Sequence, residues 1–168
     1  MSDLTQFRAS KDDFFGHHDH SPLNPQQKSS FNSLDYFPEN NDLRLTLAVE
    51  QFPEQEEIVV QTSTGDAQTY ARYGSFSFEV EGQTTTLTIL TNEYGYFLPF
   101  VDSLANTETY GAGRYLEPQS LGGDQFLVDF NLAYNPYCAY NDKWSCPLTP
   151  WENRIKVPIR AGEKIFEK

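Results

Sequence analysis

The chain has 168 residues, a formal net charge of −12, and 13 Phe and 10 Tyr against one Met. This length suits one domain with a sizeable core. The acidic balance argues against nucleic-acid binding, which needs a basic patch, and no stretch approaches the roughly 20 apolar residues that cross a bilayer.

The N-terminal region predicts one short helix followed by an irregular arm. Residues 4–15 carry apolar side chains at helical spacing, and Gly16, Pro22 and Pro25 break the helix after them. Charges occupy the place of a signal peptide's apolar run, so we expect a cytoplasmic protein. Histidines 17, 18 and 20 are of a metal-binding type, but no second ligand cluster accompanies them. We therefore expect an exposed turn and no metal site.

From residue 43 onward the apolar pattern changes to a period of two, which is typical of half-buried strands. Glu81-Gly82 marks a tight hairpin between two alternating runs. Strands are predicted at residues 43–52, 56–62, 68–73, 75–81, 83–91, 95–102, 113–117 and 125–130, with one or two more in 154–166. Since no helices alternate with them, we predict an all-β fold, an antiparallel barrel-like structure or curled sandwich. The N-terminal helix would pack across an opening or edge.

The expected organisation is a single domain over residues 1–168, in which residues 1–40 form the helix and arm and residues 41–168 form the β domain. Within the latter, residues 129–153 make a long loop that contains both cysteines, both tryptophans and three prolines. Each proline removes a ladder donor, so the segment cannot continue a strand. A connection of this length is usually functional or disordered, and its aromatic content argues against disorder.

A second loop, residues 108–114, places Gly111 and Gly113 beside Arg114. Glycines let backbone approach a ligand, and a guanidinium binds anions bidentately. We therefore hypothesise that the 108–114 and 129–153 loops line a pocket for a small polar or anionic ligand. The residues that would bind it are Arg114, Asp129, Asn131, Tyr134, Asn135, Glu152 and Asn153.

Two alternatives to this pocket remain open at the level of the sequence. Arg114 is equally suited to a structural ion pair with Asp102, Glu108 or Asp129. The Asn and Asp side chains of the loop are equally suited to capping the loop's own backbone, whose polar groups need partners.

Cys138 and Cys146 stand eight residues apart and are the thiol candidates. A persistent disulfide is disfavoured in the cytoplasm, although it would stabilise the chain by roughly 2.6 kcal/mol through loop closure. Zinc needs four ligands, and the histidines are distant in sequence. We order the interpretations as reduced structural cysteines, a redox-sensitive pair, a zinc site and, last, a Cys138 nucleophile.

Two further function classes compete with ligand binding. One is an enzyme that uses Asp129, Glu152 or Cys138, which requires a carboxylate or thiol of perturbed pKa in a cleft. The other is a protein-interaction module that presents the aromatic loop as an exposed patch. The sequence indicates no cofactor, no membrane partner and no particular oligomeric state.

Several segments, in order along most of the chain, resemble the bacterial and archaeal family known as domain of unknown function 1684. They are SPL (21–23), the Phe31 to Pro38 motif, ETYGAGRYL (108–116), DFNLAYNPYCAY (129–140), CPLTPWENRI (146–155) and IRAGEK (159–164). The chain departs from the family pattern where Thr149-Pro150-Trp151 replaces a Pro-Pro before Glu-Asn. The resemblance implies membership as a short form and implies no reaction.

Overall fold

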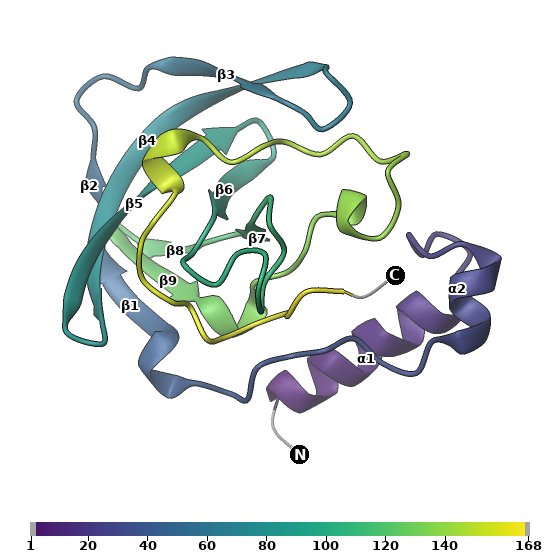
Figure 1. Cartoon of the computed structure of the whole chain (residues 1–168). Helices are drawn as coiled ribbons and strands as arrows, with labels where there is room; N and C mark the ends of the chain where they lie inside the picture. The colour runs from purple at the N-terminus through teal and green to yellow at the C-terminus, as the bar shows by residue number, and fades with distance from the viewer. Residues whose placement is uncertain (1–2, 167–168) are drawn as a thin grey trace.

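The computed structural model describes residues 3–166, and its helices lie on one side of two antiparallel sheets (Figure 1). Helix α1 (Asp3–His17) and the short α2 (Pro25–Ser30) form the N-terminal part. Asn24 caps α2 through a reciprocal bond with Gln27. Among the described residues, no helix is both long and apolar enough to cross a membrane.

The strands form a three-stranded sheet and a six-stranded sheet. The smaller sheet has the order β1-β9-β8, from β1 (Arg44–Ala48), β9 (Gln125–Asp129) and β8 (Gln119–Gly122). The larger has the order β2-β4-β5-β6-β7, and β3 also pairs with β4. Its strands are β2 (Glu50–Gln51), β3 (Glu57–Gln61), β4 (Ala67–Val80), β5 (Gln83–Asn92), β6 (Gly95–Phe100) and β7 (Arg114–Leu116). The sheets curl without closing, so the predicted all-β curled sandwich is confirmed.

The central pair, β4 and β5, is a long hairpin that turns at Glu81 and Gly82, both with positive φ. The sequence pattern predicts two strands where β4 is one strand of 14 residues. A bulge between Arg72 and Gly74 shifts the alternation at that point and makes one strand look like two. A Cβ on Gly74 would lie 2.6 Å from the Glu50 carbonyl oxygen, so glycine allows β2 to approach there.

The main core lies between the sheets and is filled by side chains from both. It includes Phe76, Leu87, Phe100, Phe126 and Phe130. Phe130 packs edge-to-face on Phe100 and stacks on Phe78, in geometries that aromatic pairs prefer. Because these rings occupy the interior, the sites with free chemistry lie among the loops.

The structure corrects the sequence prediction at two further places. Residues 154–166 were expected to supply one or two strands, but they run as an extended segment with only isolated bridges, such as Tyr36 with Glu163. Strand β8 was not predicted, because all four of its residues are exposed and show no apolar alternation. The long loop is not featureless, since it contains the single-turn 3₁₀ helices η2 (Phe130–Leu132), η3 (Tyr137–Ala139) and η4 (Trp151–Asn153).

Candidate functional site

Arg114 lies in the interior, 0 % exposed, and its guanidinium is bound by the protein itself. Nη1 donates to the carbonyls of Ala161 and Glu163, and Nη2 donates to that of Ile159 at 2.9 Å. Asp102 lies 3.6 Å from Nη2, so the structural ion pair considered from the sequence is present. Burial lowers the pKa of Arg114 to about 10, a shift that Asp102 opposes. The guanidinium therefore stays charged at neutral pH and holds the C-terminal segment.

The two glycines near Arg114 leave space that other atoms of the protein occupy. A Cβ on Gly113, which has φ +100°, would lie 2.5 Å from the Phe100 carbonyl oxygen. A Cβ on Gly111 would lie 2.0 Å from Oδ1 of Asn106. The close backbone approach that the sequence suggests is thus real, but it serves packing between neighbouring segments.

Glu163 is a second buried charge of the same region. Its carboxylate accepts hydrogen bonds from Lys11 of α1, from the Asn135 backbone N–H at 3.0 Å and from the Tyr140 hydroxyl at 2.9 Å. The Asn135 side chain donates to the Lys164 carbonyl at 2.9 Å. Asn135 therefore joins the long loop to the C-terminal segment.

The remaining polar residues of the predicted ligand site also bond within the protein. Asp129 accepts from Arg44 at 3.1 Å and from the Asn131 backbone at 3.0 Å, and Asn131 exchanges bonds with the backbone of Asn40. The Tyr134 hydroxyl donates to Glu117. The bond from the Asn131 backbone to Asp129 is a cap within the loop, as the second alternative expects, whereas the other bonds join the loop to neighbouring segments.

The C-terminal end of the loop is attached to the large sheet. Asn153 is fully buried and bonds to both backbone groups of Thr88 and to the carbonyl of Pro99, each at 2.8 Å. Glu152 accepts a bidentate bond from Arg72 and a bond from the Thr88 hydroxyl. The Arg72 bond is the largest cause that lowers the pKa of Glu152.

The two loops of the sequence hypothesis contact each other, and one of these contacts is at the thiols. Tyr115 and Tyr134 form a backbone bridge, with N–H to carbonyl bonds of 2.8 and 3.0 Å. Beside it, both cysteines form one cluster with aromatic side chains from both loops. The rings that pack there are those of Tyr110, Tyr115, Tyr134, Tyr137, Trp144 and Phe97.

Within this cluster both cysteines are free thiols, and they pack against one another. The Cys138 backbone N–H also donates to Cys146 Sγ at 3.4 Å. The hydroxyl of Tyr110, from the other loop, lies 3.8 Å from Cys138 Sγ. We call Cys138, Cys146 and Tyr110 the thiol site.

The surroundings of the two cysteines shift their pKa values in opposite directions. The bond from Cys146 lowers the pKa of Cys138 to about 6, against burial, with further lowering from the Tyr110 and Ser63 hydroxyls. The same bond and burial raise the pKa of Cys146. Burial, with smaller effects from Cys138, raises the pKa of Tyr110. These opposite shifts favour a thiolate on Cys138 over one on Cys146.

Cys146 is held by the turn that joins β3 and β4. Its N–H donates to the Ser63 hydroxyl at 3.2 Å, and its carbonyl accepts from the Ser63 backbone at 2.9 Å. Ser145 bonds to the hydroxyls of Thr62 and Thr64, each at 2.8 Å. Cys138 sits on η3, so the two thiols belong to separately anchored segments.

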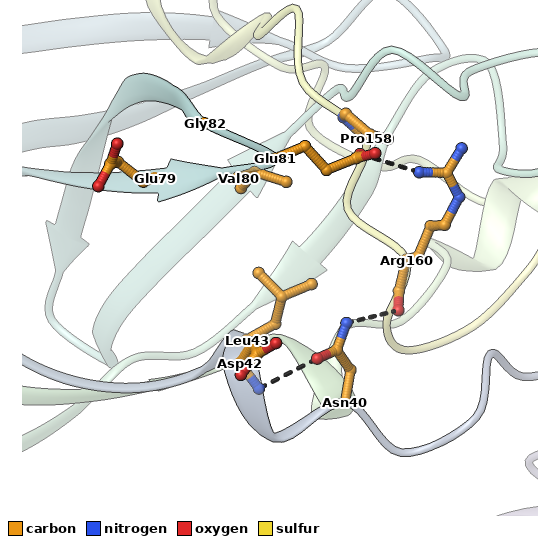
Figure 2. A pocket seen from close by; sticks show the side chains of 9 residues that line it. All are labelled: Asn40, Asp42, Leu43, Glu79, Val80, Glu81, Gly82, Pro158 and Arg160. Atoms are coloured by element: carbon orange, nitrogen blue, oxygen red, sulfur yellow. Dashed lines mark hydrogen bonds and ion pairs between the residues drawn. The ribbon is translucent and has the colours of Figure 1, made fainter.

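The cavity drawn in Figure 2 lies elsewhere, between the β4–β5 hairpin and the segments around residues 40 and 160. Its volume is about 470 Å³, and the predicted ligand residues are absent from its lining. Glu81 pairs with Arg160 at 3.0 Å, and the Asn40 side chain bonds to Asp42 and Arg160 backbone atoms.

No group of three or more His, Cys, Asp or Glu side chains suited to a metal ion occurs within residues 3–166. The histidines at positions 17, 18 and 20 are exposed. Sequence reasoning missed Tyr110 and Ser63 as thiol partners. The spacing of Tyr110 from Cys138, 28 residues, carries no local signal.

Comparison with known proteins identifies relatives but no activity. The family model described as "Protein of unknown function (DUF1684)" matches residues 29–164. A solution NMR structure of an uncharacterized protein of Haloarcula marismortui is similar, with 34% sequence identity and a TM-score of 0.71. The match covers 96% of this chain and 91% of that one. No curated protein matches the chain significantly.

Proposed function

Because the chain belongs to the DUF1684 family, whose description states no function, we propose a function from the geometry alone: Cys138 and Cys146 form a reversible, redox-active dithiol. The disulfide would link the η3 segment to the segment held by the β3–β4 turn. This develops the redox-pair interpretation of the sequence, in the reducing cytoplasm that we expect for the protein.

The observation that carries the proposal is the contact between the two cysteines. Cys146 Sγ accepts from the Cys138 N–H at 3.4 Å, and both thiols belong to one buried cluster, so the Cys146 side chain faces Cys138. Thiol–disulfide chemistry requires a thiolate with a second sulfur within reach. A pair that only filled the core would need neither the backbone N–H at Cys146 Sγ nor the Tyr110 hydroxyl beside Cys138.

The chemistry is a two-electron oxidation. The Cys138 thiolate and the Cys146 thiol together lose two electrons and the Cys146 proton as the S–S bond forms. The acceptor is a small disulfide or a hydroperoxide, and a dithiol reductant reverses the reaction.

The small-ligand hypothesis receives less support from the same coordinates. Its central residue, Arg114, is buried with its guanidinium on three carbonyls and Asp102. The carboxylates of the enzyme alternative, Asp129 and Glu152, are each paired with an arginine. Of the predicted site residues, the two thiols are the ones that remain able to form and break a covalent bond.

The test is a redox titration of the purified protein. We expect incubation in mixtures of reduced and oxidised dithiothreitol, followed by denaturation and alkylation, to show loss of both alkylation sites together along a two-electron curve. Peptide mapping would then recover residues 138 and 146 in one cross-linked species.

The variants Cys138→Ser and Cys146→Ser control for intermolecular bonds, since each leaves one thiol that can cross-link only between molecules. Two thiols that stay alkylatable at the oxidising end would contradict the proposed function. So would a wild-type protein that yields only intermolecular disulfides.

A further inference from the structure

Resting on the dithiol function proposed above, we infer that the electron acceptor of the thiol site is a small hydroperoxide, with Cys138 as nucleophile and the Tyr110 hydroxyl as proton donor. The inference concerns the class of oxidant and the role of Tyr110.

Restricted access selects a small oxidant. Cys138 is 6 % exposed and Cys146 is 8 % exposed, beneath the rings of the aromatic cluster. A disulfide oxidant must bring its S–S bond into line with the attacking sulfur, together with the peptide groups that carry it. A hydroperoxide brings only two oxygen atoms to the sulfur. The same burial therefore favours a small peroxide over a peptide disulfide as the oxidant.

Contacts within the thiol site assign the order of the two cysteines. The Tyr110 hydroxyl lies 3.8 Å from Cys138 Sγ, whereas the Cys138 backbone N–H lies at Cys146 Sγ. The pKa of Cys138 is lowered and that of Cys146 is raised, in keeping with this arrangement. We therefore assign Cys138, the sulfur beside the proton donor, as the nucleophile, and Cys146 as the thiol that resolves the oxidised product.

Tyr110 is placed to protonate the oxygen that leaves. Its hydroxyl lies 3.8 Å from Cys138 Sγ, and burial raises its pKa, so it keeps its proton at neutral pH. When a thiolate attacks a peroxide, negative charge develops on the departing oxygen, and a positioned proton donor accelerates such a step.

The reaction balances as follows. Cys138 S⁻ attacks the terminal oxygen of R–O–O–H, an S–O bond forms, and the O–O bond breaks. The departing RO⁻ takes the Tyr110 proton, and the phenolate recovers from solvent the proton that Cys138 released. Cys146 sulfur then attacks the Cys138 sulfenic acid, and hydroxide leaves with the Cys146 proton as water. The sum is two thiols and ROOH giving a disulfide, ROH and water.

The experiment compares the rate of disulfide formation with hydrogen peroxide and with glutathione disulfide at equal concentration. We expect hydrogen peroxide to react about tenfold faster or more, and Tyr110→Phe to slow that reaction by about tenfold or more. Tyr94→Phe is the matched control, because Tyr94 is exposed and far from the thiols in sequence, and its rate should equal wild type. Cys146→Ser should stop at a sulfenic acid on Cys138 that dimedone traps.

A pH profile separates proton donation from an indirect effect on Cys138. If Tyr110→Phe acts only by raising the Cys138 pKa, its peroxide rate returns to wild type at a pH of about 10.5, about two units above an ordinary cysteine pKa, where the thiolate is fully formed. That return would overturn the role of Tyr110. Faster oxidation by glutathione disulfide would overturn the hydroperoxide inference and leave the dithiol intact. Failure of both oxidants to form the disulfide would overturn the dithiol function itself.

Discussion

The guanidinium of Arg114 and the carboxylate of Asp102 lie 3.6 Å apart, and both side chains are buried. The two groups carry opposite charges, and both bind the same stretch of the chain. Arg114 donates to the Ile159 carbonyl, while Asp102 accepts from the Ile159 N–H at 2.8 Å. Asp102 also accepts from the Thr109 hydroxyl. The pair is therefore a clamp on residues 159–163.

Removal of one charge from this clamp should destabilise the fold strongly. We expect Arg114→Met to lower the free energy of unfolding by about 3–5 kcal/mol, because Asp102 and several carbonyls lose their partner in the interior. Arg154→Met removes an exposed arginine that stacks on Trp151 and should cost less than about 1 kcal/mol. Urea denaturation of both variants measures the difference. Equal costs would show that the clamp is not a structural centre.

The thiol pair predicts an unusual titration. Because the pKa of Cys138 is lowered to about 6, ultraviolet absorbance of the thiolate should appear as pH rises through about 6, rather than near 8.5. Cys146 is the largest cause of the lowered Cys138 pKa, so Cys146→Ser should raise that pKa. Cys138→Ser should abolish the low-pH step. A wild-type titration that begins only above pH of about 8 would contradict the assigned hydrogen bond.

The bridge between Arg72 and Glu152 predicts a pH-dependent contribution to stability. The folded-state pKa of Glu152 is lowered, chiefly by Arg72, so the unfolded chain binds the proton more readily. The contribution is then fully present above the unfolded pKa of about 4.3 and is lost as pH falls through the lower folded pKa. We expect Glu152→Gln to cost about 0.5–1 kcal/mol at neutral pH, since the side chains are partly exposed. Thermal unfolding should show that difference shrink in acid.

Gly113 and Gly65 allow backbone conformation to be separated from packing. Both have positive φ, of +100° and +90°, but a Cβ on Gly65 would meet nothing within 4 Å, whereas a Cβ on Gly113 would meet the Phe100 carbonyl at 2.5 Å. Gly65→Ala should therefore cost about 1 kcal/mol from conformation alone. Gly113→Ala should cost at least about 2 kcal/mol more, because backbone must move. Chemical denaturation of the two variants tests the comparison, and equal costs would refute the close contact.

Local patterns predicted the elements that alternate and failed where long-range contacts decide. The runs around β5 and β9 appear as strands near their predicted positions, although burial alternates in β9 and not in β5. The apolar residues of 154–166 are also spaced like a strand, yet Val157, Ile159 and Ala161 are buried in the main core while the backbone of this segment binds side chains such as Arg114. The alternation of apolar residues in an extended segment does not determine whether its backbone pairs with a strand or with side chains.

The candidate site shows the same difference between what local sequence predicts and what long-range contacts decide. A lone arginine among acids marks Arg114 as unusual, but its carbonyl partners lie at least 45 residues away and are found only by folding. The spacing of Cys138 and Cys146 permits a pair, whereas the Tyr110 hydroxyl that completes the thiol site arrives from another loop. Residue type and spacing thus predicted the candidate residues, and tertiary contacts decided which of them remained available to react.

The clamp also bears on the order in which the protein can mature during synthesis. Arg114 enters the interior with the β7 strand, but the carbonyls that solvate its charge belong to residues 159–163. Until the ribosome has released those residues, closing the sandwich would strand a cation in a dry environment, which is strongly unfavourable. We therefore expect the nascent sheets to remain open, with their aromatic faces exposed to chaperones or to neighbouring chains, until residues 159–163 have emerged.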